Sequence, residues 1–155
     1  MTSREMDRVL IGLAKFETGL SRVYEKLSGK LYFRQQVKSF WSELANEEMS
    51  QAQVFNELRE RVVSDDSFKV HIGSDMDFLK EFVNRAKELV KKVETDISEA
   101  QAYKLCAEIE GDLDEASFID RIQMQDDMLS RKLSRVKADT RKHRMVLINY
   151  ARGIK

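Results

Sequence analysis

The sequence contains no proline, one cysteine and six glycines among its 155 residues. The commonest interruption of long helices is therefore missing. A single cysteine excludes an internal disulfide and any zinc or iron–sulfur site built from the cysteines of one chain, and its rarity is typical of a reducing compartment. Lysine and arginine total 27, as do aspartate and glutamate, so no basic excess indicates a nucleic-acid partner.

Long apolar runs are missing as well. No uninterrupted stretch approaches the ~20 residues that a membrane-spanning helix needs. The segment 1–16 carries Arg4, Glu5, Asp7 and Arg8 in place of the apolar core of a signal peptide. Charged residues make up 35% of the chain, and the two signs are interspersed as on a solvated helix surface. We therefore expect one cytoplasmic domain over 1–155, with neither a membrane nor a nucleic acid as partner.

Periodic apolar residues predict an all-α fold. The expected helices cover about 3–27, 32–63, 75–93, 96–122 and 126–151. The first two are joined by a short turn, so they should form an antiparallel hairpin, and the last two should form another. The connection between the hairpins is long and holds the middle helix. Two hairpins joined by one long crossover make one kind of four-helix bundle, and a simple up-down-up-down bundle with a fifth helix is the alternative.

Two local signals refine this outline. Asp96, with Glu99 three residues later, is typical of a capping box at the start of the third bundle helix. Phe68, Val70 and Ile72 alternate with polar residues within the crossover, which indicates a short extended stretch there.

Each of the four bundle helices has an apolar face that polar residues interrupt near its middle. The apolar residues recur at steps of three and four, which places them on one side of a helix. The interrupting residues are Glu17 in the first helix, Glu48 and Gln51 in the second, Glu110 and Ser117 in the third, and Thr140 and His143 in the fourth. A buried carboxylate is costly unless it is paired or binds a metal. These positions therefore predict one shared polar layer inside the bundle.

The polar layer follows a known pattern of metal ligands. Dimetal carboxylate bundles take one glutamate from each of two helices and a Glu-x-x-His pair from each of the other two. The positions agree with this pattern, and two of the six residue types differ from it. The single positions hold Glu17 and Glu110, and the paired positions hold Glu48-x-x-Gln51 and Thr140-x-x-His143.

The motifs around these positions carry a family resemblance. Leu44-Ala45-Asn46-Glu47-Glu48-Met49-Ser50-Gln51-Ala52 is similar to a Leu-Ala-x-Glu-Glu-x-x-His-Ala stretch. The other matching motifs are Ala14-x-x-Glu17 followed by Tyr24, Ile109-Glu110, and Ala138-Asp139-Thr140-Arg141-Lys142-His143. On these residues the chain resembles a rubrerythrin-like member of the ferritin-like superfamily over nearly its whole length. The resemblance implies a ferritin-like four-helix bundle with an extra helix in the long crossover.

The resemblance also implies non-haem iron chemistry. The family's di-iron site oxidises iron with peroxide or oxygen, and in rubrerythrins it reduces peroxide. The implied metal ligands are Glu17, Glu48, Gln51, Glu110 and His143, with one or two iron ions, or zinc or manganese, as the metal. The rubredoxin-like tail with paired cysteines is missing, so electrons are expected from a separate donor protein. A homodimer is expected by analogy with the family.

Two departures from the family pattern weaken the expected site. Thr140 stands where the family has a bridging carboxylate, and a neutral hydroxyl is a poor bridge between cations. Glu48, Glu110 and His143 remain as a set that suffices for one zinc, manganese or iron ion. The half-site with Glu17 is weaker, because it has an amide where the family has an imidazole. The competing hypothesis is a metal-free ferritin-like binding or structural protein that has lost the redox site.

Some further side chains are given roles from their positions. Cys106 lies one turn before Glu110 and is expected to be a small buried apolar residue. Glu47 is expected to face solvent or a helix flank. Tyr24 and Tyr150 are expected in the core or beside the polar layer, with a radical or relay role as the alternative.

Overall fold

The computed structural model describes residues 3–64, 70–72, 76–112, 122–124 and 127–153. Within these ranges the chain forms five helices and two short strands. The helices are α1 (Ser3–Ser28), α2 (Gln35–Ser64), α3 (Met76–Val93), α4 (Glu99–Asp112) and α6 (Asp127–Gly153), and the strands are β1 (Val70–Ile72) and β2 (Ile122–Met124). The prediction of an all-α bundle is confirmed, with the strand pair as a small addition.

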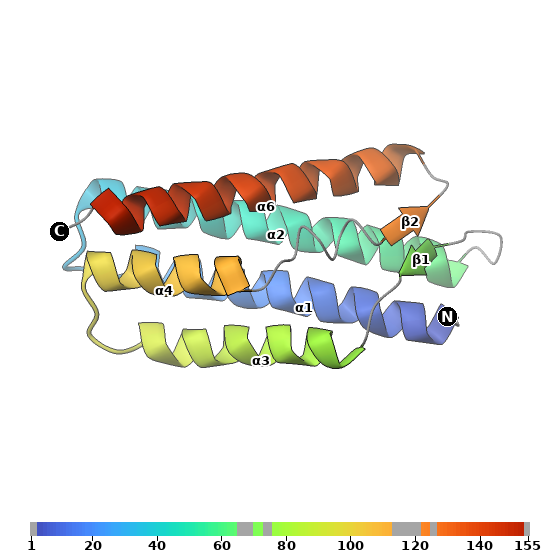
Figure 1. The fold of residues 1–155 in the computed structure, drawn as a ribbon, viewed down its shortest axis with the longest axis horizontal. Coiled ribbons are helices and arrows are strands. Elements are labelled where there is room, and N and C mark those ends of the chain that lie inside the picture. The colour runs from blue at the N-terminus through green and yellow to red at the C-terminus, as the bar shows by residue number, and fades with distance from the viewer. Residues whose placement is uncertain (1–2, 65–69, 73–75, 113–121, 125–126, 154–155) are drawn as a thin grey trace.

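The helices lie roughly parallel to one long axis (Figure 1). α1 and α2 form an antiparallel hairpin, and α3 then runs back along α1. Because α3 takes the chain back along the bundle, α4 runs in the same direction as α2, and α6 returns antiparallel to α4. One crossover that contains α3 therefore joins two hairpins, which differs from a simple up-down-up-down bundle.

The two strands tie the crossover to the connection between α4 and α6. β1 and β2 pair antiparallel, with Val70 opposite Met124 and Ile72 opposite Ile122. The pair lies at the end of the bundle where α1 begins (Figure 1). The extended stretch expected in the crossover is thus present over its last two alternating residues, and Phe68 lies outside the described residues.

The third bundle helix ends differently from the prediction. The expected helix covered 96–122, whereas α4 is described from Glu99 to Asp112. Residues 113–121 lie outside the described part of the chain, and Ile122 belongs to β2, so the predicted end is wrong. The strand was missed because three residues, whose partner strand lies far away in the chain, carry no periodic signal of their own.

The start of α4 was predicted too early. Thr95 closes α3, because its backbone N–H and its hydroxyl donate to a carbonyl oxygen of the last turn of α3, at 3.3 and 2.6 Å. Ser98 Oγ accepts from the backbone N–H of Gln101 at 3.1 Å, and Gln101 Oε1 accepts from the backbone N–H of Ser98 at 2.8 Å. The capping box is therefore Ser98 with Gln101, and the predicted pair of Asp96 with Glu99 is wrong.

The residues just before α2 hold the second hairpin in place. The Tyr32 hydroxyl donates to the carbonyl oxygen of Ile97 at 2.8 Å and accepts from its N–H at 3.1 Å. The backbone N–H and the Nε–H of Arg34 donate to the two carboxylate oxygens of Glu99, at 2.8 and 2.9 Å. These bonds join the two interhelical turns, and α2 begins only after them, at Gln35 rather than at the predicted residue 32.

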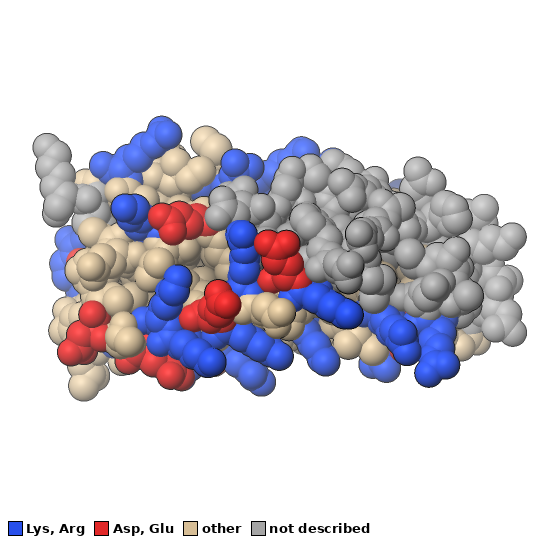
Figure 2. Space-filling view, turned by 60° about the horizontal axis from the view of Figure 1, so that its bottom comes forward, with Lys and Arg blue, Asp and Glu red and all other residues tan. Residues whose placement is uncertain are grey.

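α3 packs closely on α1 and carries a charged outer face. A Cβ at Gly19 would lie 3.1 Å from the Cβ of Ala86, so the glycine lets the two helices approach. Lysine and arginine side chains gather over this side of the bundle (Figure 2). A groove of about 870 Å³ between α1, α2 and α3 has a mixed lining that includes the basic residues Lys15, Arg22, Arg59, Lys87 and Lys91. None of the described helices combines the length and the apolar character that crossing a membrane requires.

The core between the helices is apolar except for one group of polar side chains. Its largest fully buried members are Trp41, Tyr24, Tyr103, Phe16 and Phe55. The buried polar side chains are Glu17, Ser21, Glu48, Gln51, Glu110, Thr140 and His143. All but Ser21 are positions at which the sequence predicted a polar interruption.

Candidate metal centre

The predicted polar layer is present in the described part of the bundle. Its six described positions are at most 6% exposed, and they come from all four bundle helices. They are Glu17 on α1, Glu48 and Gln51 on α2, Glu110 on α4, and Thr140 and His143 on α6. The helical spacing of the apolar residues around them turns each one inward. Ser117 lies outside the described residues.

Glu48, Glu110 and His143 come together as a candidate ligand set. One ligand atom from each lies within 4.8 Å of the other two, and all three side chains are buried. His143 Nδ1 is 3.1 Å from Glu48 Oε1. Two carboxylates and an imidazole are donors that suit zinc, manganese or ferrous iron.

Glu17 and Gln51 form the other half of the layer. The orientation of the Gln51 amide follows from its neighbours, because only its nitrogen can donate to carboxylates. In that orientation the nitrogen lies 3.2 Å from both Glu17 Oε2 and Glu48 Oε2 and donates to each. The second oxygen of Glu17, Oε1, is buried and has no hydrogen-bond partner among the described residues. The Gln51 amide thus donates one N–H to each of the two facing carboxylates.

Thr140 is buried in the layer, but its hydroxyl forms a hydrogen bond within its own helix. Its hydroxyl donates to the carbonyl oxygen of Val136, one turn earlier in α6, at 2.9 Å. Among the described residues, no hydrogen bond joins it to a glutamate of the layer. Thr140 therefore does not replace the bridging carboxylate that the family has at this position.

Two buried side chains, Tyr24 and Cys106, lie next to Glu110. The Tyr24 phenol donates to Glu110 Oε1 at 2.5 Å, a short bond of the kind that a carboxylate acceptor makes. Burial, followed by the charge of Glu110, raises the pKa of Tyr24 well above its usual value, so the phenol stays a neutral donor. Cys106 is fully buried, and burial raises its pKa, which agrees with the apolar role expected for it.

Burial dominates the electrostatics of the layer. It raises the pKa of Glu110 to about 8, with the charge of Glu48 adding to this rise and the Tyr24 hydrogen bond opposing it. Burial also raises the pKa of Glu48, against the lowering effect of His143. Burial would lower the pKa of His143, but the hydrogen bond and charge of Glu48, with Glu110 and Glu47, raise it to about 9. The metal-free layer therefore holds protons that a metal ion would displace.

Glu47 is the residue of the site that the sequence analysis missed. Its Oε2 is hydrogen-bonded to His143 Nε2, although half of its side chain is exposed to solvent. The prediction that Glu47 faces solvent or a helix flank is confirmed, but its contact with His143 was not predicted. A signal was available, because an imidazole with one nitrogen facing a buried carboxylate needs a partner for its other nitrogen. Glu47 is next to Glu48 in the chain and was a candidate for that partner.

A surface pocket between α2 and α6 borders the layer. A pocket of about 330 Å³ is lined by Glu47 and Gln51 on α2 and by Val136 on α6. Lys132 and Glu57 also line it and form an ion pair across the two helices at 2.6 Å. A small ligand in this pocket would therefore lie against Glu47 and Gln51.

The raised pKa values predict how the stability of the metal-free protein depends on pH. The folded state binds protons more tightly than the unfolded chain, with pKa values of about 8 against 4.5 for Glu110 and about 9 against 6.5 for His143. Their stabilising contribution is complete below the unfolded values and is lost as pH rises through the folded ones. We expect the thermal midpoint of the metal-free protein to decrease as the pH is raised from 5 to 9. The decrease should be smaller in Glu110→Gln. Equal slopes for the two proteins would contradict the raised pKa of Glu110.

Comparisons of the chain with protein-family models, with curated proteins and with solved structures find no match. The resemblance to rubrerythrins therefore rests on the sequence motifs around Glu17, Glu48, Glu110 and His143. It remains a prediction, whereas the burial and proximity of these side chains are structural findings.

Proposed function

We propose that this chain is a ferritin-like metal protein of rubrerythrin type that binds one divalent ion, iron in the first place, between Glu48, Glu110 and His143. The observation that carries the proposal is the approach of three buried ligand atoms, from three different helices, to within 4.8 Å of one another. The connectivity supports it, because two hairpins joined by one long crossover make the ferritin-like topology.

The residues present fit a single ion. Glu48 and Glu110 are two buried carboxylates with raised pKa values, and a cation between them would offset the cost of their burial. The bond of His143 Nε2 to Glu47 holds the ring with Nδ1 toward Glu48. A carboxylate on the far nitrogen is the usual support of a histidine that binds metal.

The side chains around the ion would support reduction of peroxide or oxygen. Ferrous iron, when bound, would supply one electron to that chemistry, and the remaining electrons would come from a separate donor. Tyr24 orients Glu110 through its hydrogen bond, and Glu47 holds the proton of His143 Nε2 at the mouth of the pocket. The pocket between α2 and α6 would bring molecules as small as peroxide against Glu47 and Gln51 at the edge of the layer.

A metal-free binding or structural protein is the second candidate. Two observations favour it over a dimetal site. The Gln51 amide already satisfies one oxygen each of Glu17 and Glu48, and Thr140 supplies no fourth carboxylate. A network of this kind can satisfy a buried layer without any ion.

Metal loading tests the two candidates. The protein is incubated anaerobically with ferrous iron, zinc or manganese at pH 8, where His143 is more readily deprotonated than at lower pH, then desalted and analysed for metal per chain. We expect one equivalent of iron in the wild type and loss of metal in Glu110→Gln and in His143→Gln. Both variants keep a polar side chain in the layer.

Glu57→Gln is the matched control, since it removes a glutamate of α2 that pairs with Lys132 outside the layer. It should retain as much metal as the wild type. A wild-type chain that retains none of the three metals would reject the metal protein and support the metal-free candidate.

A further inference from the structure

An unbroken column of aromatic rings runs from the polar layer to the surface. The ring centroids lie 5.4 Å apart for Tyr24 and Trp41, 5.0 Å for Trp41 and Tyr103, and 5.0 Å for Tyr103 and Tyr150. Successive rings are stacked, with interplanar angles of 26°, 28° and 11°. At the inner end Tyr24 donates to Glu110, and at the outer end Tyr150 is 45% exposed. The column thus connects a candidate metal ligand with solvent.

The column gathers the chain's most easily oxidised aromatic side chains. The sequence has one tryptophan and four tyrosines, and the tryptophan and three of the tyrosines stand in it, with Tyr32 outside. Aromatic stacking also stabilises a core. Stacking alone needs neither a phenol nor an indole, however, and the chain has eight phenylalanines that could provide it. Phe40 does so beside the outer rings, with its centroid 5.0–5.4 Å from Trp41, Tyr103 and Tyr150.

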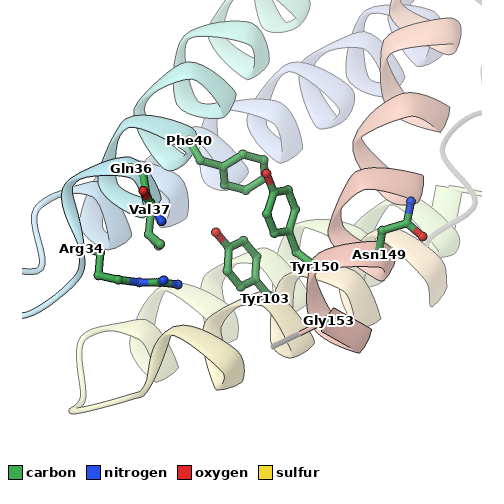
Figure 3. Close-up of a pocket in the computed structure, with 8 residues that line it drawn as sticks. All are labelled: Arg34, Gln36, Val37, Phe40, Tyr103, Asn149, Tyr150 and Gly153. Atoms are coloured by element: carbon green, nitrogen blue, oxygen red, sulfur yellow. The ribbon is translucent and has the colours of Figure 1, made fainter. Parts of the chain in front are cut away.

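The outer end of the column opens into a pocket of about 490 Å³. Its lining includes Tyr103, Tyr150 and Phe40, with Arg34 and Asn149 at its sides, and the two tyrosine rings face each other (Figure 3). A flat aromatic molecule can stack on such rings. The terminal N–H groups of Arg34, which lies beside the rings (Figure 3), can donate to the oxygen atoms of that molecule. The pocket therefore suits a reductant of the hydroquinone class.

We propose that Tyr150, Tyr103, Trp41 and Tyr24 form an electron path between a hydroquinone-type reductant in this pocket and a metal ion held by Glu110. This inference rests on the proposed function. In each passage the reductant loses one electron, which moves along the four rings and reduces the ion by one electron. Two passages oxidise the hydroquinone to the quinone, and its two protons leave to solvent at the pocket. The rate of electron tunnelling falls exponentially with distance, so short steps between oxidisable rings are faster than one long jump.

The hydrogen bonds of the rings indicate which side chain of the column becomes the radical when one electron is removed. The N–H of Trp41 is buried and has no acceptor among the described residues. An oxidised Trp41 therefore has no base to take its proton, and it regains an electron from a neighbouring tyrosine. The phenolic proton of Tyr24, in contrast, can move to Glu110 Oε1 at 2.5 Å when Glu110 is ionised, which requires a pH above its pKa of about 8. When an electron is withdrawn at the surface, the resulting radical should therefore form on Tyr24.

The path can be tested without any metal. A ruthenium polypyridyl sensitiser is attached through Asn149→Cys at the rim of the pocket, and labelling is selective because Cys106 is fully buried. At pH 9, where Glu110 is ionised, light and an oxidative quencher then withdraw an electron from the outer end of the column. We expect electron paramagnetic resonance to detect a tyrosyl radical that is lost in Tyr24→Phe and in Tyr103→Phe but retained in the control Tyr32→Phe. Each variant keeps its aromatic ring, and circular dichroism checks its fold.

A Tyr24 radical that forms equally well in Tyr103→Phe would overturn the path. Because the protein carries no metal in this test, the result separates the two proposals. A Tyr24 radical in a chain that retains no metal would overturn the proposed function and leave the path from the pocket to Tyr24 standing. Metal binding without a Tyr24 radical would overturn the path alone.

Discussion

Replacing His143 with alanine is expected to lower the free energy of unfolding of the metal-free protein by about 3–5 kcal/mol at neutral pH, because the change leaves a buried charge without its partner. His143 is hydrogen-bonded to Glu48 through Nδ1 and to Glu47 through Nε2. Glu47 can turn to solvent, but Glu48 is 2% exposed and cannot. Without the imidazolium, Glu48 must either stay charged in the core or take up a proton, and both outcomes cost stability.

Urea unfolding at two pH values separates these contributions. The loss in His143→Ala should be smaller at pH 5 than at pH 7, because the pKa of Glu48 is raised by burial and a neutral carboxyl is tolerated better. The matched control is the double variant with Glu48→Gln, which removes the charge that His143 compensates. Replacing His143 should therefore lower the free energy of unfolding less in the Glu48→Gln background than in the wild type. Additive effects of the two changes would mean that the pair is not coupled.

The polar layer could be predicted from the sequence because helical periodicity places side chains on a face before their partners are known. Glu17, Glu48, Glu110 and His143 each interrupt an apolar series with spacings of three and four, and each proves to be buried. The prediction needed only that the helices pack with their apolar faces together. The same rule predicted the five helices, whose ends were less certain because capping depends on a few local hydrogen bonds.

The remaining features depend on contacts between distant segments, which periodicity does not encode. Glu47 lies beside the predicted face of α2, and only the position of α6 brings His143 to it. The direction of the Gln51 amide is set by two carboxylates on two helices. β2 exists only because β1 is beside it. The aromatic column likewise joins rings from α1, α2, α4 and α6, so no single segment of the sequence indicates it.

Restoring the two missing ligands together is expected to raise the bound metal from one ion per chain to two. Thr140→Glu adds a carboxylate at a buried position of α6 between the layer's helices, and Gln51→His replaces an amide with an imidazole. Thr140→Glu alone should be insufficient, because the Gln51 nitrogen would still donate to Glu17 and Glu48 and so occupy one oxygen of each. Elemental analysis after anaerobic iron loading measures the change.

The charge of the added carboxylate, rather than its size, should be responsible for this gain. Two divalent ions bring four positive charges, which Glu17, Glu48, Glu110 and the introduced carboxylate would balance. The matched control is Gln51→His with Thr140→Gln, which has the same shape without the charge and should stay at one ion. Before loading, the Thr140→Glu protein should unfold at a lower temperature than this control, because its buried carboxylates repel one another, and metal should reverse the order. Two ions in the control, or one in both variants, would mean that Thr140 does not occupy the position of the family's bridging ligand.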